Sequence, residues 1–148
     1  MKGNVVILVI LVVVLTVIAL KPKCYLGDNM VLEYIRKDLI RVDPGIAKIQ
    51  IKESTQAYTE NKNTIYVCVR DENGNLYNYN MLVYVILHEY AHVLDPSISV
   101  GKNHTDSFHK IFNDLLKKAE SLGIYDSKQP LYPTYCGVNI PFPYHVPI

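Results

Sequence analysis

The sequence of 148 residues predicts a single α+β domain that follows one N-terminal transmembrane helix. Three features support this prediction. A long aliphatic run begins the chain, two short segments rich in β-branched residues follow it, and two helical patterns occupy the second half. We expect the membrane segment at 1–23, the folded domain at 24–126, and a tail rich in proline and tyrosine at 127–148 that packs on the domain.

The aliphatic run covers residues 5–20 and contains Thr16 as its single polar side chain. As a helix this run would extend about 24 Å, a little short of the bilayer hydrocarbon thickness of about 30 Å, and Gly3, Asn4 and the flanking lysines, which can reach the headgroups, make spanning plausible. It therefore predicts a single-pass membrane protein that contacts the bilayer through residues 5–20. A cleaved signal peptide is the alternative, since Val17 and Ala19 suit the cleavage positions.

Charges beyond the aliphatic run are balanced. Lys2 is the only charged residue before Lys21, so the rest of the chain carries 14 basic and 14 acidic residues. Nucleic-acid-binding proteins usually display a basic surface, and this composition does not provide one. Direct contact between the domain and nucleic acid is therefore not expected.

The chain contains three cysteines, Cys24, Cys68 and Cys136, and no CxxC pair. An odd number without paired spacing argues against a disulfide scaffold and against a cysteine zinc site. Reduced thiols are expected, which favours a cytosolic domain. One disulfide with one free thiol stays open as the alternative.

The first half of the domain is predicted to form one helix and then two strands. Apolar residues recur at helical spacing over 29–41, and Asp28 can cap the start of this helix. The isoleucine-rich segment 46–51 and the alternating segment 64–70 read as strands. The sequence DENGN at 71–75 is typical of a tight turn.

Two helices are predicted in the second half. Residues 80–94 are apolar on nearly every side, which is typical of a buried helix, and Asp95-Pro96 ends it. The second helix extends from about Thr105, a suitable cap, to Leu122, and Gly123 follows it. Its apolar stripe consists of Phe108, Ile111, Phe112, Leu115, Leu116, Ala119 and Leu122. The tail beyond it is expected to cover the domain without much regular structure.

The buried helix contains the motif HEYAH, from His88 to His92. Residues four apart share one helix face, so both imidazoles can reach a single ion at about 2.0–2.1 Å. Glu89 projects about 100° round the helix from His88, where it can take a proton from a zinc-bound water. This is the HExxH pattern of zinc metallopeptidases, and zinc would also satisfy polar groups that are costly to bury alone.

A catalytic zinc site requires a third protein ligand and leaves a fourth position open. His104 is the preferred candidate, because it stands just before the second helix and four residues ahead of Phe108, on the side that faces the core. The alternatives are Asp95, His109 and Glu120.

The segment 64–125 resembles the WLM-type zincin-like metallopeptidases, which are relatives of the SprT/Spartan proteases and include small versions in large DNA viruses. In that family a strand and a turn lead into the HExxH helix, and a histidine in an H-x-x-x-F pattern then completes the zinc site. That pattern corresponds to His104–Phe108 here. The resemblance thus implies a minimal zincin-like fold, zinc on His88, His92 and His104, and Glu89 as the catalytic base.

The predicted function is a membrane-tethered zinc metalloendopeptidase that uses Zn²⁺ and hydrolyses a protein or peptide substrate through a zinc-bound water activated by Glu89. The alternative is a non-catalytic, zinc-stabilised interaction domain at a membrane, which would need no carboxylate at that position. A third possibility is an α+β adaptor without metal. The sequon at Asn103–Thr105 favours the cytosolic side, because a glycan would obstruct the neighbouring His104, although the charges flanking the membrane segment are nearly balanced. The sequence does not predict the oligomeric state.

Overall fold

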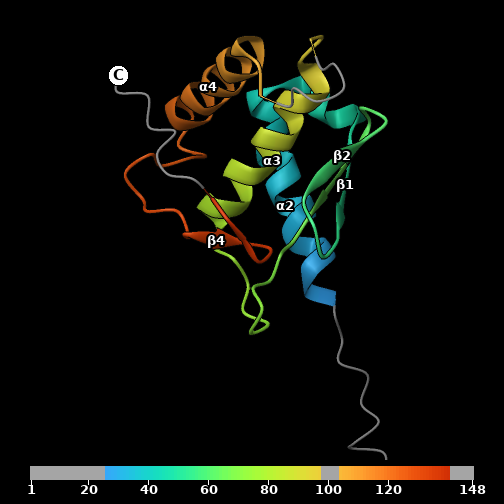
Figure 1. Cartoon of the computed structure of the whole chain (residues 1–148), viewed down its shortest axis with the longest axis vertical. Helices are drawn as coiled ribbons and strands as arrows, with labels where there is room; N and C mark the ends of the chain where they lie inside the picture. The colour runs from blue at the N-terminus through green and yellow to red at the C-terminus, as the bar shows by residue number, and fades with distance from the viewer. Residues whose placement is uncertain (1–25, 98–103, 141–148) are drawn as a thin grey trace, which may run out of the picture.

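The computed structural model describes residues 26–97 and 104–140, and Figure 1 shows how their elements are arranged. The fold of these residues is α+β, as predicted. The elements in chain order are α2 (Leu26–Val42), the 3-10 helix η1 (Pro44–Lys48), β1 (Gln50–Glu53), β2 (Tyr58–Glu60), β3 (Thr64–Val67), α3 (Tyr79–Leu94), α4 (Asp106–Ser121), β4 (Thr134–Tyr135) and β5 (Val138–Asn139).

The predicted transmembrane helix and the single-pass membrane localisation are wrong for the part of the chain that the structure describes. Over 26–97 and 104–140, no helix combines the length and the apolar character needed to cross a membrane. The most apolar helix, α3, has 16 residues. It would extend about 24 Å, short of the bilayer core of about 30 Å. The segment 1–23 itself lies outside the described residues.

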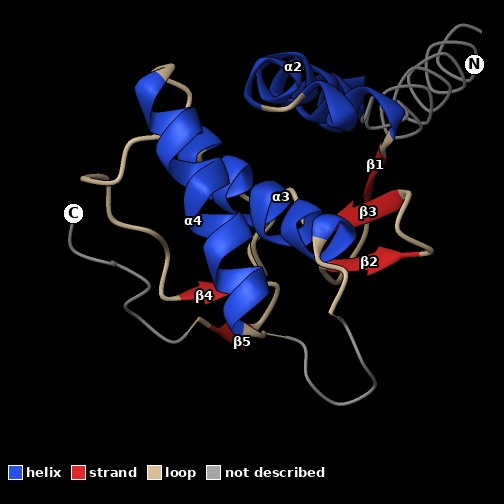
Figure 2. Cartoon of the chain, turned by 90° about the horizontal axis from the view of Figure 1, so that it is seen from above, coloured by secondary structure: helices blue, strands red, loops and turns tan. Residues whose placement is uncertain are grey.

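Strand β3 forms the centre of a three-stranded sheet with the order β1-β3-β2. β1 runs parallel to β3 and places Ile51 beside Ile65, whereas β2 runs antiparallel and places Thr59 beside Ile65. Residues paired in this way point to the same face of a sheet. Ile65 is buried, and the sheet lies against α3, with α4 on the opposite side of that helix (Figure 2). Thr59 therefore projects from the sheet toward α3.

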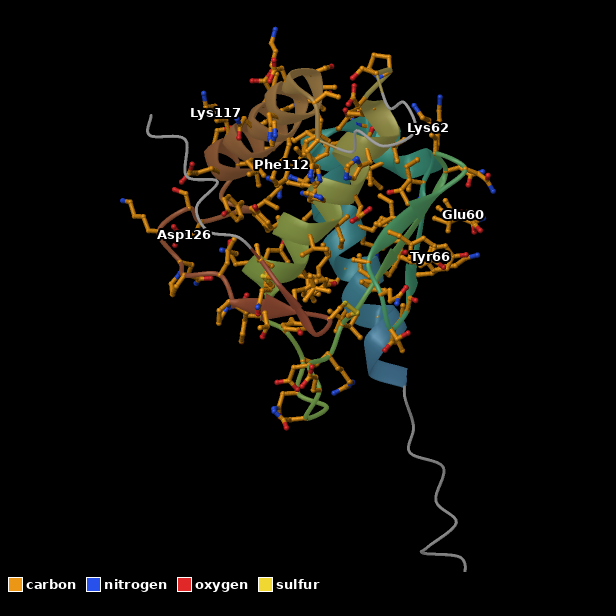
Figure 3. The ribbon with its side chains drawn as sticks, viewed as in Figure 1. Glu60, Lys62, Tyr66, Phe112, Lys117 and Asp126 are labelled. Atoms are coloured by element: carbon orange, nitrogen blue, oxygen red, sulfur yellow. A yellow bond between two sulfur atoms is a disulfide. The ribbon has the colours of Figure 1, made fainter. Side chains whose placement is uncertain are left out.

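The other face of the sheet is largely exposed, although Thr64 on it is buried. The rings of Tyr58 and Tyr66 stack there with centroids 4.5 Å apart. The Tyr66 hydroxyl also donates to Glu60 at 3.2 Å. Figure 3 shows Tyr66 and Glu60 on the side of the strands that points away from α3. Among the described residues, α3 packs on the face of the sheet that carries Ile65, and Thr59 lies on this same face.

The segment 46–51 was predicted as a strand, but residues 44–48 form η1 and the strand begins at Gln50. The Asp43 carboxylate accepts a hydrogen bond from Gly45 N at 2.7 Å, and a proline follows at the first helical position. Arg36 of α2 then donates to the carbonyls of Ala47 and Ile49 at 2.6 and 3.3 Å. These capping bonds override the β preference of the isoleucines, because they satisfy the backbone in a helical turn.

Helix α3 is the central element of the core. Asn78 caps its start by accepting a bond from Met81 N at 2.8 Å. It is buried on nearly every side, as the sequence predicted, and its wholly or largely buried residues are Asn80, Met81, Leu82, Val83, Tyr84, Val85, Ile86, Leu87, Glu89, Tyr90 and Ala91. It contacts the sheet on one side and α4 on the other. The HExxH motif therefore sits on the most constrained element of the domain.

Helix α4 begins and ends close to the predicted residues. Thr105 caps it by accepting a bond from Phe108 N at 3.1 Å, and Gly123 follows with φ of 67°. Its buried positions are Phe108, Phe112, Leu115 and Ala119. Figure 3 shows Phe112 pointing inward toward α3 and Lys117 pointing outward.

The tail was expected to have little regular structure, and its described residues contain one short antiparallel hairpin, in which β4 and β5 have two residues each. A disulfide joins Cys136 of this hairpin to Cys68, which follows β3, so the prediction of reduced thiols is wrong for this pair. The buried Tyr135 donates its hydroxyl to the Cys68 carbonyl at 2.7 Å, and Cys136 N donates to the Tyr77 hydroxyl at 3.1 Å. The disulfide also removes the cysteine argument for a cytosolic domain. Cys24 lies outside the described residues.

Candidate metal centre

Three histidines converge at the junction of α3 and α4. His88 and His92 lie one turn apart on α3, and His104 lies two residues before the start of α4. Nitrogen atoms of the three rings all lie within 4.8 Å of one another, and the Nε2 atoms of His88 and His104 are 3.2 Å apart. Two imidazole nitrogens on a tetrahedral zinc ion would be about 3.3 Å apart, given the usual bond lengths. The donor set, and the spacing of the His88 and His104 nitrogens in particular, therefore fit one zinc ion.

Phe108 of α4 packs against all three imidazoles. Its ring centroid lies 4.3 Å from that of His92, 4.7 Å from His104 and 5.0 Å from His88. Phe112, one turn later, approaches His88 at 5.2 Å. These contacts restrict the rotation of the rings, so the apolar stripe of α4 holds the imidazoles in place.

The three rings are neutral at physiological pH. Burial lowers the pKa of His88 to about 3 and that of His92 to about 4, and burial also lowers the pKa of His104. A neutral imidazole keeps a lone pair available for a metal ion. The electrostatic state of the cluster therefore favours coordination at neutral pH.

Glu89 lies beside the histidine cluster and is 7% exposed. The Thr59 hydroxyl lies 3.0 Å from Glu89 Oε2 and 3.0 Å from the Glu89 carbonyl oxygen, so it can donate its one proton to either atom. Burial raises the pKa of Glu89 to about 7, against the opposing effect of the Thr59 bond. A carboxylate whose pKa is close to the working pH is well suited to general acid–base chemistry.

A buried carboxylate joins the end of α3 to the start of α4. Asp95 Oδ1 accepts bonds from Ser97 N at 2.9 Å and from the Ser97 hydroxyl at 2.6 Å. Its Oδ2 accepts a bond from the Thr105 hydroxyl at 2.9 Å. Because Thr105 is adjacent to His104, this clasp of Asp95, Ser97 and Thr105 holds the third histidine beside the other two.

We expect Asp95→Asn to lower the melting temperature at neutral pH, and the difference from the parent to disappear in acid. The Ser97 hydroxyl, with further donors from Ser97 and Thr105, lowers the pKa of Asp95 to about 2. In the unfolded chain the pKa is about 3.9. A lowered folded pKa stabilises the protein above the unfolded value, and this stabilisation is lost as the pH falls through the folded value.

Thermal unfolding followed between pH 7 and pH 2 tests this expectation. The difference between parent and variant should be constant down to about pH 5 and then shrink toward pH 2. Asp114→Asn, at an exposed position of α4, is the matched control and should change little. A difference for Asp95→Asn that does not vary with pH would contradict a role for the charged carboxylate.

The other candidate ligands lie elsewhere. Both carboxylate oxygens of Asp95 accept hydrogen bonds within the clasp. Glu120 lies near the C-terminal end of α4, where its carboxylate accepts hydrogen bonds from the Ser127 hydroxyl and amide. The ring of His109 is 6.1 Å from that of His104, centroid to centroid, and is not part of the cluster. Among the described residues, the cluster that could hold a metal therefore consists of His88, His92 and His104.

Two cavities of similar size meet at Glu89. The first has a volume of about 420 Å³ and is lined mainly by apolar side chains of α3 and of the β4–β5 hairpin. The second has a volume of about 390 Å³, and its lining includes Tyr58, Asn61, Lys62 and His92. Figure 3 shows Lys62 at the β2–β3 turn, near the end of α3. Glu89 lines both cavities and so stands at the point where they meet.

Sequence reasoning missed Thr59 and the hairpin wall of the first cavity. The sequence carried a signal for the turn after β2, because asparagine at position 61 favours a tight turn between two strands. In the structure Asn61 and Lys62 adopt φ of 51° and 56°. Gly137 is a similar signal for the turn of the second hairpin, where Cys136 and Gly137 adopt φ of 52° and 72°. Strands of two or three residues carry too little alternation to be found by periodicity alone.

Three viral proteins are similar to this chain. It is 40% identical over 94 residues to "Uncharacterized protein 136R" of Invertebrate iridescent virus 6, a match that covers 62% of this chain and 51% of that protein. It is also 40% identical over 91 residues to "Uncharacterized protein 042R" of Invertebrate iridescent virus 3, covering 61% and 55% of the two chains. "Uncharacterized protein R325" of Acanthamoeba polyphaga mimivirus is 40% identical over 62 residues, covering 41% and 29%.

The chain thus spans about half the length of the two iridescent-virus relatives. No protein-family profile matches the chain. No solved structure matches it either.

Proposed function

We propose that this protein is a zinc-dependent metallopeptidase in which Glu89 is the general base. The observation that carries this proposal is the convergence of the His88, His92 and His104 nitrogens within 4.8 Å, with a buried carboxylate next to the first ligand. A histidine triad leaves the fourth position of a tetrahedral ion open, which is characteristic of catalytic zinc sites. The resemblance to WLM-type metallopeptidases belongs to the same proposal.

A bound zinc ion would polarise the carbonyl of the scissile peptide bond and lower the pKa of water in its open position. The protein's own part is to move protons and to fix geometry. When the Thr59 hydroxyl donates to Glu89 Oε2, Oε1 is left to accept the proton of the attacking water. Glu89 then delivers this proton to the nitrogen of the leaving amine, so that the carboxylate is regenerated.

The surroundings of Glu89 fit this role. A pKa of about 7 means that the carboxylate can both accept and release a proton near neutral pH. Thr59 fixes the side chain from the sheet, while α3 fixes it from the backbone. A site for a purely structural ion would have no use for a carboxylate held in this way.

Metal analysis of the full-length protein tests the proposal. We expect one zinc ion per chain in the parent, and a loss of zinc affinity of more than about 100-fold in His104→Ala, since removal of a supporting group alone typically costs 10- to 100-fold. His109→Ala is the matched control, because this histidine is adjacent in space but outside the cluster, and it should retain zinc.

Hydrolysis of casein by the same preparations completes the test. The parent should cleave it, and a chelator should stop the cleavage. A parent that binds no zinc would refute the proposal. A parent that binds zinc and cleaves nothing would instead favour the non-catalytic, zinc-stabilised domain.

A further inference from the structure

The first of the two cavities beside Glu89 has an apolar character that the zinc chemistry does not require. Its inner wall is formed by Tyr84 and Val85 of α3, both of which are buried. Its outer wall is formed by Val138 and Ile140 of the hairpin, and Val138 is 66% exposed. A volume of about 420 Å³ lies within the range of about 300–1,000 Å³ that is usual for ligand pockets.

The cavity opens directly onto the candidate metal centre. Besides Glu89, its lining includes His88 and His104, two members of the histidine cluster. A peptide bond placed at Glu89 would therefore have a neighbouring side chain within reach of the apolar walls. If the proposed peptidase cleaves a bond at Glu89, this cavity lies beside a residue next to that bond.

The cavity is held in shape by the hairpin. Tyr135 is 5% exposed, lines the cavity and donates its hydroxyl to the Cys68 carbonyl. The adjacent Cys136 also lines the cavity and is joined to Cys68 by the disulfide. The outer wall is thus attached to the end of β3 by a covalent bond and a hydrogen bond. A preformed apolar pocket binds its ligand with a smaller entropic cost than one that must be assembled.

The second cavity differs in its chemistry. It carries Lys62, whose amino group donates to the Asp95 carbonyl at 2.9 Å, together with Asn61 and Tyr58. The two sides of Glu89 therefore differ, since the first is lined mainly by apolar side chains and the second has a more mixed lining that includes the amino group of Lys62. We expect a large apolar side chain to be accommodated better on the first side.

We propose that the cavity between α3 and the β4–β5 hairpin accepts a large apolar side chain of the substrate, so that cleavage occurs beside residues such as Phe, Leu or Met. This inference rests on the proposed peptidase function and names its substrate class. Because one large apolar group is withdrawn from water, we expect a preference of about 10- to 100-fold over alanine at that position. An acidic residue there should be rejected, because its charge would lose hydration without gaining a partner.

Hydrolysis of a peptide series by the full-length protein tests the preference. The series consists of fluorogenic Gly/Ser peptides with Phe, Ala or Asp at one central position, and kcat/KM is measured for each. Val138→Asp should lower kcat/KM for the Phe peptide by about tenfold or more while changing the Ala peptide little. Met30→Asp is the matched control, because Met30 is 65% exposed on α2 and is not among the residues that line the cavity, and it should leave both values unchanged.

A binding measurement separates this inference from the peptidase proposal. The probe is N-acetylphenylalaninamide, compared with N-acetylalaninamide, added to the Glu89→Gln variant. Methyl resonances of Val85, Val138 and Ile140 should shift with the phenylalanine probe at about tenfold lower concentration than with the alanine probe.

Each outcome has a defined meaning. Selective methyl shifts together with a parent that cleaves no peptide would support the pocket and refute the peptidase. Cleavage of the Phe and Ala peptides at equal rates would overturn the pocket and leave the peptidase standing. Absence of methyl shifts with either probe would also overturn the pocket.

Discussion

Replacing Glu89 by glutamine is expected to lower kcat/KM for peptide hydrolysis by about 10²- to 10⁴-fold while zinc remains bound. Glutamine has nearly the same shape and still offers an oxygen to the Thr59 hydroxyl, but its amide cannot accept the proton of water. The histidine cluster does not use this side chain, so metal content should equal that of the parent. Zinc content and kcat/KM measured on the same preparation test both halves of the expectation.

Glu60→Gln is the matched control for this substitution. Glu60 lies one position after Thr59 on β2, on the exposed face of the sheet, where it accepts a bond from Tyr66. The same chemical change at this site should leave both zinc content and hydrolysis unaltered. If Glu89→Gln hydrolysed peptides at the parental rate, Glu89 would not be the general base and another group would have to carry the proton.

Removal of the Cys68–Cys136 disulfide is expected to lower the free energy of unfolding by about 4 kcal/mol. The bond joins residues 68 positions apart in the sequence. Cross-linking such a long loop reduces the conformational entropy of the unfolded chain, which is the main source of stabilisation in the chain-entropy account. Urea unfolding of Cys68→Ala with Cys136→Ala, compared with the parent, measures the difference.

The reduced parent provides the control for this prediction. In the presence of a reductant, the parent should become as unstable as the double variant, while the double variant should not respond to the reductant. An unfolding midpoint of the parent that is insensitive to reduction would show that the disulfide does not contribute to stability. Equal urea unfolding midpoints for the oxidised parent and the double variant would also show that the disulfide does not contribute to stability.

The two long helices of the second half could be predicted because their signals are local. The Asp95-Pro96 stop and the Thr105 cap lie within one turn of the helix ends that they define. The spacing of His88 and His92 is a local signal of the same kind. So is the position of His104, four residues before Phe108, and together they predicted that the three histidines lie near one another. Such features require only the geometry of a helix and the burial of its apolar stripe.

What could not be predicted depends on contacts between distant segments. Thr59 reaches Glu89 across 30 positions of the chain, because β2 pairs with β3 in a particular register. The pairing of Cys68 with Cys136 depends on where the tail returns to β3, which no spacing of cysteines encodes. The apolar cavity is lined by residues that precede β2, by the β4–β5 hairpin and by α3, so it becomes visible only once the chain is folded.

The clasp of Asp95, Ser97 and Thr105 has a thermodynamic consequence for the candidate centre. The clasp ties α3 to α4, and an ion held by His92 and His104 would tie the same two helices a second time. A ligand that binds the folded state alone adds its binding free energy to folding, about 2.7 kcal/mol when its free concentration is one hundred times its dissociation constant. Binding of a metal ion and the packing of α3 against α4 would therefore be linked, and each would raise the population of the state that the other requires.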